Sequence, residues 1–259
     1  MNRSSLSVGD VVSAGLRIYR DRFKTYFPLA IIASFWAIIP IYGSAKYGQA
    51  TGLISRLAFG EIIEKPESVN EGRNRVRPLL WTFLLASLLI SLIVFGIVFV
   101  SFFIIGVLIA IAANTNTPAL FLIIVPLFIG IFIVYFWLFT RLSLVELTIA
   151  IEGISNPTRA IGRSWQLTKQ FVGRLALIYF IAGLISLPIN LASNFILGIF
   201  QVILEGIFGA DSYIFQLLEL LISLAINLLS FGIMMPFWQS IKAAIYYDLR
   251  SQREGMDLM

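Results

Sequence analysis

Long apolar runs separated by short polar connectors dominate the hydrophobic pattern of the chain. The clear runs are 27–42, 79–113, 119–140, 175–208 and 213–238. A bilayer core of about 30 Å needs roughly 20 apolar residues in a helix, so these runs are read as membrane passes. The pattern predicts an all-α fold, a polytopic helical membrane bundle that forms a single domain over 1–259.

The positions of Lys and Arg predict which ends of the runs share a side of the membrane. Connectors 114–118 and 209–212 contain no basic residue, whereas the other connectors and both flanking segments do. By the positive-inside rule, both termini are cytoplasmic and the two short connectors are external. Only one clear run separates the first two basic groups, so the chain must return through 44–63. This predicts about six passes, with 44–63 as either a buried span or the return arm of a re-entrant hairpin.

Small residues recur in segment 44–63, which is otherwise polar for a span. Gly48, Gly52, Arg56 and Gly60 follow one another at four-residue steps, so they lie on one helical stripe. Small residues on a stripe let helices approach closely in lipid. We therefore expect this helix to be buried among its neighbours.

Two amphipathic segments, one at the N-terminus and one after Asn156-Pro157, each lead directly into an apolar run. Asn followed by Pro is a typical helix start. An apolar face opposite a basic face predicts a cytoplasmic-side helix in the membrane interface, with its aromatic ring at headgroup depth. The predicted contacts to anionic lipid headgroups or to a protein partner are Arg17, Arg20, Lys24, Arg159, Arg163, Trp165, Lys169 and Arg174.

The two amphipathic segments also align with each other. Residues 7–40 and 155–188 match without a gap, and each ends on a proline. The alignment predicts a weak internal repeat with two related halves. An equally weighted alternative is that any interfacial helix followed by a span would align this well.

Composition excludes several kinds of active site. The chain is 59% hydrophobic and 13% charged, and it contains no Cys and no His. Disulfides, thiolate or imidazole metal sites, Cys nucleophiles and Ser–His pairs are therefore excluded. The sequence has no phosphate-binding glycine loop and no nucleic-acid-binding module. We predict no cofactor, no metal and no nucleic-acid partner.

Polar residues within the predicted spans are the remaining candidates for a site. Arg56 either binds an anion or an acid, or extends its head to the nearby membrane surface. Glu219 and Asn227 share a stripe that either lines a polar path or holds two helices together by hydrogen bonds. An Arg56–Glu219 ion pair is a further hypothesis.

Segment 152–180 carries the most specific motif, Glu152 followed by Arg163-Ser164-Trp165-x-Leu167-Thr168 and an apolar run. With the opening LSVGDVVSAGLRIYRDRF and the ending FWQSIKAAIYYDLRSQREGMDL, it resembles a bacterial family of six-span proteins. That family includes the YciC-like proteins and the membrane domain fused to glycerophosphoryl diester phosphodiesterases. The resemblance covers nearly the whole chain and implies a membrane module. It implies no catalytic residues, because the phosphodiesterase chemistry belongs to a separate domain.

The favoured hypothesis is a non-enzymatic protein of the bacterial inner membrane, a scaffold, accessory or lipid-organising module that contacts anionic lipid. Another internal membrane is also compatible with the sequence. The alternative is a small transporter or channel, which requires Arg56, Glu219 and Asn227 to converge on one cavity. An enzyme acting on lipid has least support, although Glu and Asp remain available as acids and bases.

Overall fold

The structure is a computed structural model that describes residues 6–115 and 121–254, and its described elements are all helical. The all-α prediction is therefore confirmed for these residues. The ends of the predicted domain 1–259 and most of connector 114–118 lie outside them. In chain order the helices are α1 (Val8–Ala37), α2 (Tyr42–Ile62), α3 (Val69–Val76), the 3-10 turn η1 (Arg77–Leu79), α4 (Leu80–Thr115), α5 (Phe121–Leu142), α6 (Val145–Glu152), α7 (Pro157–Thr168), α8 (Val172–Phe208) and α9 (Tyr213–Glu254).

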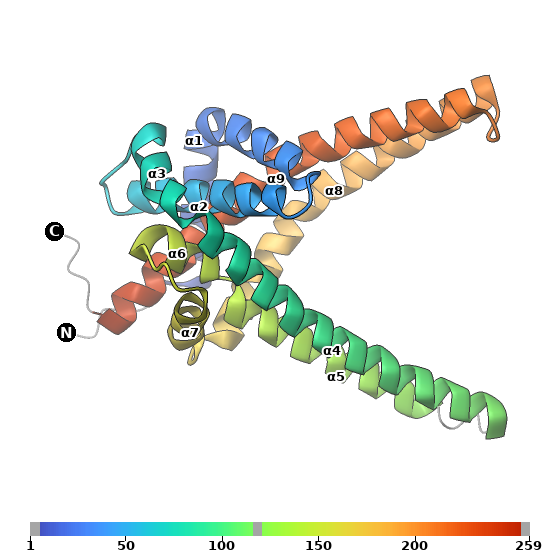
Figure 1. Cartoon of the computed structure of the whole chain (residues 1–259), viewed down its shortest axis with the longest axis horizontal. Coiled ribbons are helices and arrows are strands. Elements are labelled where there is room, and N and C mark those ends of the chain that lie inside the picture. Colours follow the sequence, from blue (N-terminus) through green and yellow to red (C-terminus); the bar gives the residue numbers. More distant parts are fainter. Residues whose placement is uncertain (1–5, 116–120, 255–259) are drawn as a thin grey trace.

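Two long helical hairpins project from a compact body and diverge as they leave it (Figure 1). We call them the α4–α5 arm and the α8–α9 arm. The body contains α1, α2, α3, α6, α7 and the C-terminal half of α9. Large apolar side chains are exposed along both arms, for example Phe102 at 73% and Val202 at 71%. The buried core lies almost entirely in the body.

Four segments of the described chain are long and apolar enough to cross a membrane. They are Val69–Ala112, Leu122–Glu152, Val172–Phe208 and Tyr213–Glu254. Helices α1 and α2 are not among them, so the structure supports four of the six predicted passes. The physical reason is that the apolar run 27–42 does not continue as one helix, because α1 ends at Ala37 and the chain turns back into α2.

The predicted helix start at Asn156-Pro157 is confirmed. The Asn156 side chain accepts hydrogen bonds from the backbone N–H groups of Thr158 and Arg159, and Pro157 occupies the first turn. Gly153 ends α6 with φ of 69°, a left-handed conformation that glycine adopts without strain. The aligned segments differ in form, because 7–40 is mainly one helix, whereas 155–188 breaks between α7 and α8.

Glycines allow the body helices to pack closely, as the sequence predicted for α2. A methyl group at Gly52 would lie 2.5 Å from Cζ of Phe83, and one at Gly48 would lie 3.2 Å from Cβ of the same residue. These two glycines therefore seat α4 against α2. Farther along α2, the hydroxyl of Ser55 donates a 2.7 Å hydrogen bond to Gln239 of α9.

Gly15 performs the same role between α1 and α9. A Cβ atom placed there would lie 2.6 Å from Cδ1 and 2.9 Å from Cα of Ile241, which is itself fully buried. Because one of these neighbours is backbone, the contact cannot be relieved by a rotamer change alone. The packing of α1 on α9 therefore depends on the missing side chain.

Gly15→Ala is expected to lower the free energy of unfolding in detergent by about 1–3 kcal/mol, the usual cost of overpacking. Thermal unfolding followed by circular dichroism measures the effect. Gly162→Ala is the matched control, because a methyl group there meets nothing within 4 Å in helix α7. Equal melting temperatures for the two variants would contradict the close packing of α1 on α9.

Candidate functional site

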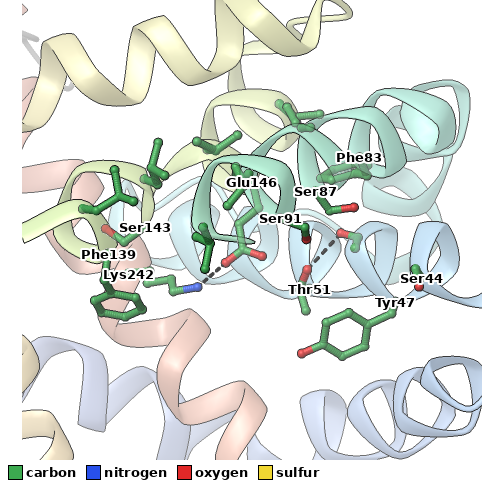
Figure 2. Close-up of a pocket in the computed structure, with 18 of the residues that line it drawn as sticks. Ser44, Tyr47, Thr51, Phe83, Ser87, Ser91, Phe139, Ser143, Glu146 and Lys242 are labelled. Carbon is green, nitrogen blue, oxygen red and sulfur yellow. Dashed lines mark hydrogen bonds and ion pairs between the residues drawn. The ribbon is translucent and has the colours of Figure 1, made fainter. Parts of the chain in front are cut away.

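A cavity opens where the α4–α5 arm leaves the body. Its volume is about 630 Å³ and its walls come from α1, α2, α4, α5, α6 and α9. We call it the inter-helix cavity. Figure 2 shows polar groups of α2 and α4 on one side and an ion pair at its inner end. Most of the remaining wall is apolar, including Phe83, Ile90, Leu138 and Phe139.

The inner end of the cavity holds its two charged lining residues. Lys242 of α9 donates a hydrogen bond to Oε1 of Glu146 in α6. Their side chains retain 17% and 21% of their exposure, so the pair is largely but not fully covered. Tyr47 lies nearby and adds a hydroxyl that can donate a hydrogen bond.

A second, apolar hollow continues the cavity along the same arm. It has a volume of about 270 Å³ and lies between α4 and α5, with Phe102, Ile105 and Phe128 among its walls. Tyr135 lines both hollows. Its hydroxyl is buried and has no hydrogen-bond partner among the described residues. The two hollows thus meet at a side chain with an unused polar group.

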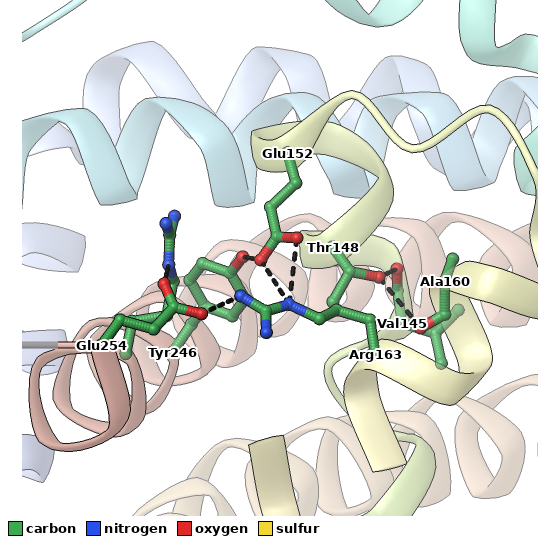
Figure 3. Close-up of polar contacts among 8 residues, drawn as sticks. Val145, Thr148, Glu152, Ala160, Arg163, Tyr246 and Glu254 are labelled. Atoms are coloured by element: carbon green, nitrogen blue, oxygen red, sulfur yellow. Dashed lines mark hydrogen bonds and ion pairs between the residues drawn. The ribbon is translucent and has the colours of Figure 1, made fainter. Parts of the chain in front are cut away.

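A network of ionic hydrogen bonds joins helices α6, α7 and α9 in the body. Arg163 of α7 donates from Nε to both carboxylate oxygens of Glu152 at 3.0 Å, and its Nη2 donates to Glu254 of α9. The Tyr246 hydroxyl also donates to Glu152. Figure 3 shows Arg163 lying between the two carboxylates. Because α6 carries both Glu152 and Glu146, this network also positions the acid of the cavity.

The predicted headgroup contacts fall into two groups. Arg17, Arg20, Lys24, Arg159 and Lys169 are exposed on the body, so their contact with lipid stays a prediction. The other three are engaged within the protein. Arg163 belongs to the network above, Arg174 forms a 2.6 Å ion pair with Asp248, and Trp165 packs against Trp137.

The polar residues predicted within the spans do not come together. Arg56 pairs with Glu67 at 2.6 Å and donates to the carbonyl oxygen of Ala150 at 2.7 Å, so the proposed Arg56–Glu219 pair is wrong. Ser55 touches Gln239, and Glu219 precedes Gln239 by 20 residues, or about 30 Å of helix. Asn227 bonds to the carbonyl of Ser223 on its own helix. The convergence that the transporter alternative requires is therefore not seen among the described residues.

Sequence reasoning missed the cavity because its charged pair joins residues 96 positions apart. Glu146 and Lys242 each follow an apolar run, which marks them as membrane edges but does not relate them to each other. The described residues contain no group of three or more potential ligand side chains placed to hold a metal ion. The arrangement offers instead an apolar hollow with one polar end.

Comparison with known families matches the chain to a domain of unknown function, DUF7847, over residues 28–249. The chain belongs to the DUF7847 family. No curated protein and no solved structure matches it. The DUF7847 match covers the α2 stripe, both arms and the cavity, and assigns an activity to none of them. What the cavity of this DUF7847 protein binds must therefore be argued from its geometry.

Glu67→Gln is expected to lower the free energy of unfolding by about 1.5–3 kcal/mol, because it removes the charged partner of a partly buried arginine. Glu219→Gln provides the matched control and should leave stability unchanged, since Glu219 forms no ion pair within the described part of the chain, where Arg56 pairs with Glu67. Chemical denaturation of both variants in the same detergent measures the difference. Destabilisation by Glu219→Gln alone would contradict the assignment of Glu67 as the partner of Arg56.

Proposed function

We propose that this DUF7847 protein is a non-enzymatic membrane protein that binds a lipid in the inter-helix cavity and acts as an accessory or lipid-organising module. The observation that carries the proposal is that the two hollows follow one another along the α4–α5 arm and share Tyr135 as a lining residue. A charged pair stands at one end, and apolar side chains of α4 from Phe83 to Ile105 line a length of about 30 Å. A lipid likewise has a polar headgroup at one end and apolar chains along the rest of its length.

The charged end favours a polar headgroup over a purely apolar guest. Lys242 and Glu146 together carry no net charge, and Tyr47 adds a neutral hydroxyl. A headgroup that both donates and accepts hydrogen bonds engages these groups without leaving either charge unpaired in apolar surroundings. The apolar chain then lies along the α4–α5 groove, which is exposed to membrane lipid from the side.

The membrane placement follows from the same separation of charge and apolar surface. We place both arms in the hydrocarbon of the bacterial inner membrane and the body at its cytoplasmic face. The basic residues gather on the body, as the positive-inside rule requires of a cytoplasmic segment. The turn at 209–212 is then external. Exposed basic residues of α1 and α7 lie where they contact anionic headgroups.

Helices α1 and α2 fit the re-entrant form of the predicted return. The Gln49 side chain donates to the carbonyl oxygens of Val76 and Arg77 at 3.1 and 3.3 Å, so it lies beside the start of the α4–α5 arm. Tyr42 begins α2 seven residues earlier, only about 10 Å farther along the helix. The turn before it exposes Ile39 and Ile41 at 45% and 70%. Because this apolar turn lies only about 10 Å beyond the start of the arm, we infer that the α1–α2 hairpin turns back within the hydrocarbon and does not cross it.

Ser91→Phe is expected to reduce lipid retention several-fold, because Ser91 lines the cavity and a phenyl ring there occupies part of its volume. Native mass spectrometry of protein purified in mild detergent measures the retained lipid. Leu92→Phe is the matched control, since Leu92 is 67% exposed on the neighbouring face of α4.

Lys242→Met should also weaken retention, because it removes the charge at the polar end of the site. Melting temperatures of all three variants establish that they are folded. The proposal fails if wild-type protein retains no lipid, or if Ser91→Phe and Leu92→Phe retain as much lipid as the wild type.

A further inference from the structure

Arg141 is a buried arginine at the end of the α4–α5 arm, away from the inter-helix cavity. Arg141 is only 4% exposed. The guanidinium carbon lies 4.2 Å from the ring centre of Trp165 and 5.8 Å from that of Trp137. The two indole rings are perpendicular, so they cover the guanidinium group from two directions. Leu138 and Leu142 line the cavity from other faces of α5.

The charge of Arg141 has no carboxylate partner among the described residues. Nη1 makes one long hydrogen bond, 3.4 Å, to the hydroxyl of Thr168. Nε is buried and makes no hydrogen bond within the described chain. A second cation, Arg253 at the end of α9, also acts electrostatically on Arg141.

This arrangement differs from that of the other covered cations of the body. Arg56, Arg163, Arg174 and Lys242 each have a carboxylate at ion-pair distance. A covered charge without a counter-ion is unfavourable, and contact with aromatic rings offsets only part of that cost. Arg141, which has an unused donor, and Arg253 therefore lack a negatively charged group that would act as their counter-ion.

We propose that Arg141, with Thr168 and Arg253, binds the phosphate group of an anionic membrane lipid at the cytoplasmic end of the α4–α5 arm. Trp137 is 42% exposed at the end of a span, where tryptophan lies at the level of lipid headgroups. Arg253 is exposed and lies over the ring of Phe171, whose backbone N–H donates to the carbonyl oxygen of Thr168, so we assign it to the open side of the site. Arginine donors in a fixed fork suit phosphate oxygens.

The test uses the full-length protein in nanodiscs of phosphatidylcholine, with and without added phosphatidylglycerol. Wild-type protein is expected to melt at a higher temperature when phosphatidylglycerol is present and to retain it in native mass spectrometry. Arg141→Gln should weaken this retention about tenfold or more, the scale of a charged hydrogen bond. Arg73→Gln is the matched control, because it removes an exposed cation of α3 that has no ion pair among the described residues and no assigned lipid contact.

Arg253→Gln and Thr168→Val keep the test decisive if Arg141→Gln does not fold, because Arg253 is exposed and Thr168→Val replaces only the hydroxyl beside Arg141 by a methyl group. Both are expected to weaken phosphatidylglycerol retention while Arg73→Gln does not. Wild-type retention in these two variants, or equal loss in Arg73→Gln, would overturn the proposal. So would an equal rise in melting temperature from inorganic phosphate in phosphatidylcholine nanodiscs, which would assign the site to a free anion.

Discussion

An ionised side chain is stable in or near hydrocarbon only when it is paired or reaches water, and this constraint organises the whole DUF7847 structure. The ion pairs of the described chain lie in the body or where an arm joins it. The arms beyond the body carry almost only apolar side chains on their surfaces. Basic charge is thereby confined to the body end of the molecule, whereas the acids Glu205, Asp211 and Glu219 stand at the far end of the α8–α9 arm.

The inter-helix cavity is a consequence of how the arms leave the body. Close packing holds α1, α2 and α9 together through Gly15 and the Ser55–Gln239 hydrogen bond, while Gly52 seats α4 at its first turns. Beyond this contact the arms diverge (Figure 1), and the described residues leave the inter-helix cavity beside α4 and α5. The boundary between packed body and divergent arms is also where the Lys242–Glu146 pair stands. Apolar surface and a polar end therefore meet at one place.

Local features of this fold were predictable because they depend on neighbouring residues. Asn156-Pro157 and Gly153 mark helix ends through their own backbone preferences, and the glycine stripe of α2 indicates close packing wherever its partner lies. Partners distant in sequence were not predictable. Arg56 pairs with Glu67 in a loop and not with Glu219 in a span, and Lys242 pairs with Glu146, 96 positions away in the sequence. Hydropathy predicts a pass over 27–42 but does not record where a helix ends, and α1 ends at Ala37 before the chain turns back into α2.

Cysteine accessibility at the α1–α2 turn tests the account most directly, because the native chain has no cysteine and single substitutions carry no background. Ile41→Cys and Asp211→Cys would each be exposed to a membrane-impermeant maleimide from either side of sealed inner-membrane vesicles. We predict that Asp211→Cys reacts from the external side only and that Ile41→Cys is protected from both sides until detergent is added. Reaction of Ile41→Cys from the same side as Asp211→Cys would mean that α1 and α2 cross the membrane. That result would contradict a hairpin that ends in the hydrocarbon beside a cavity open to lipid.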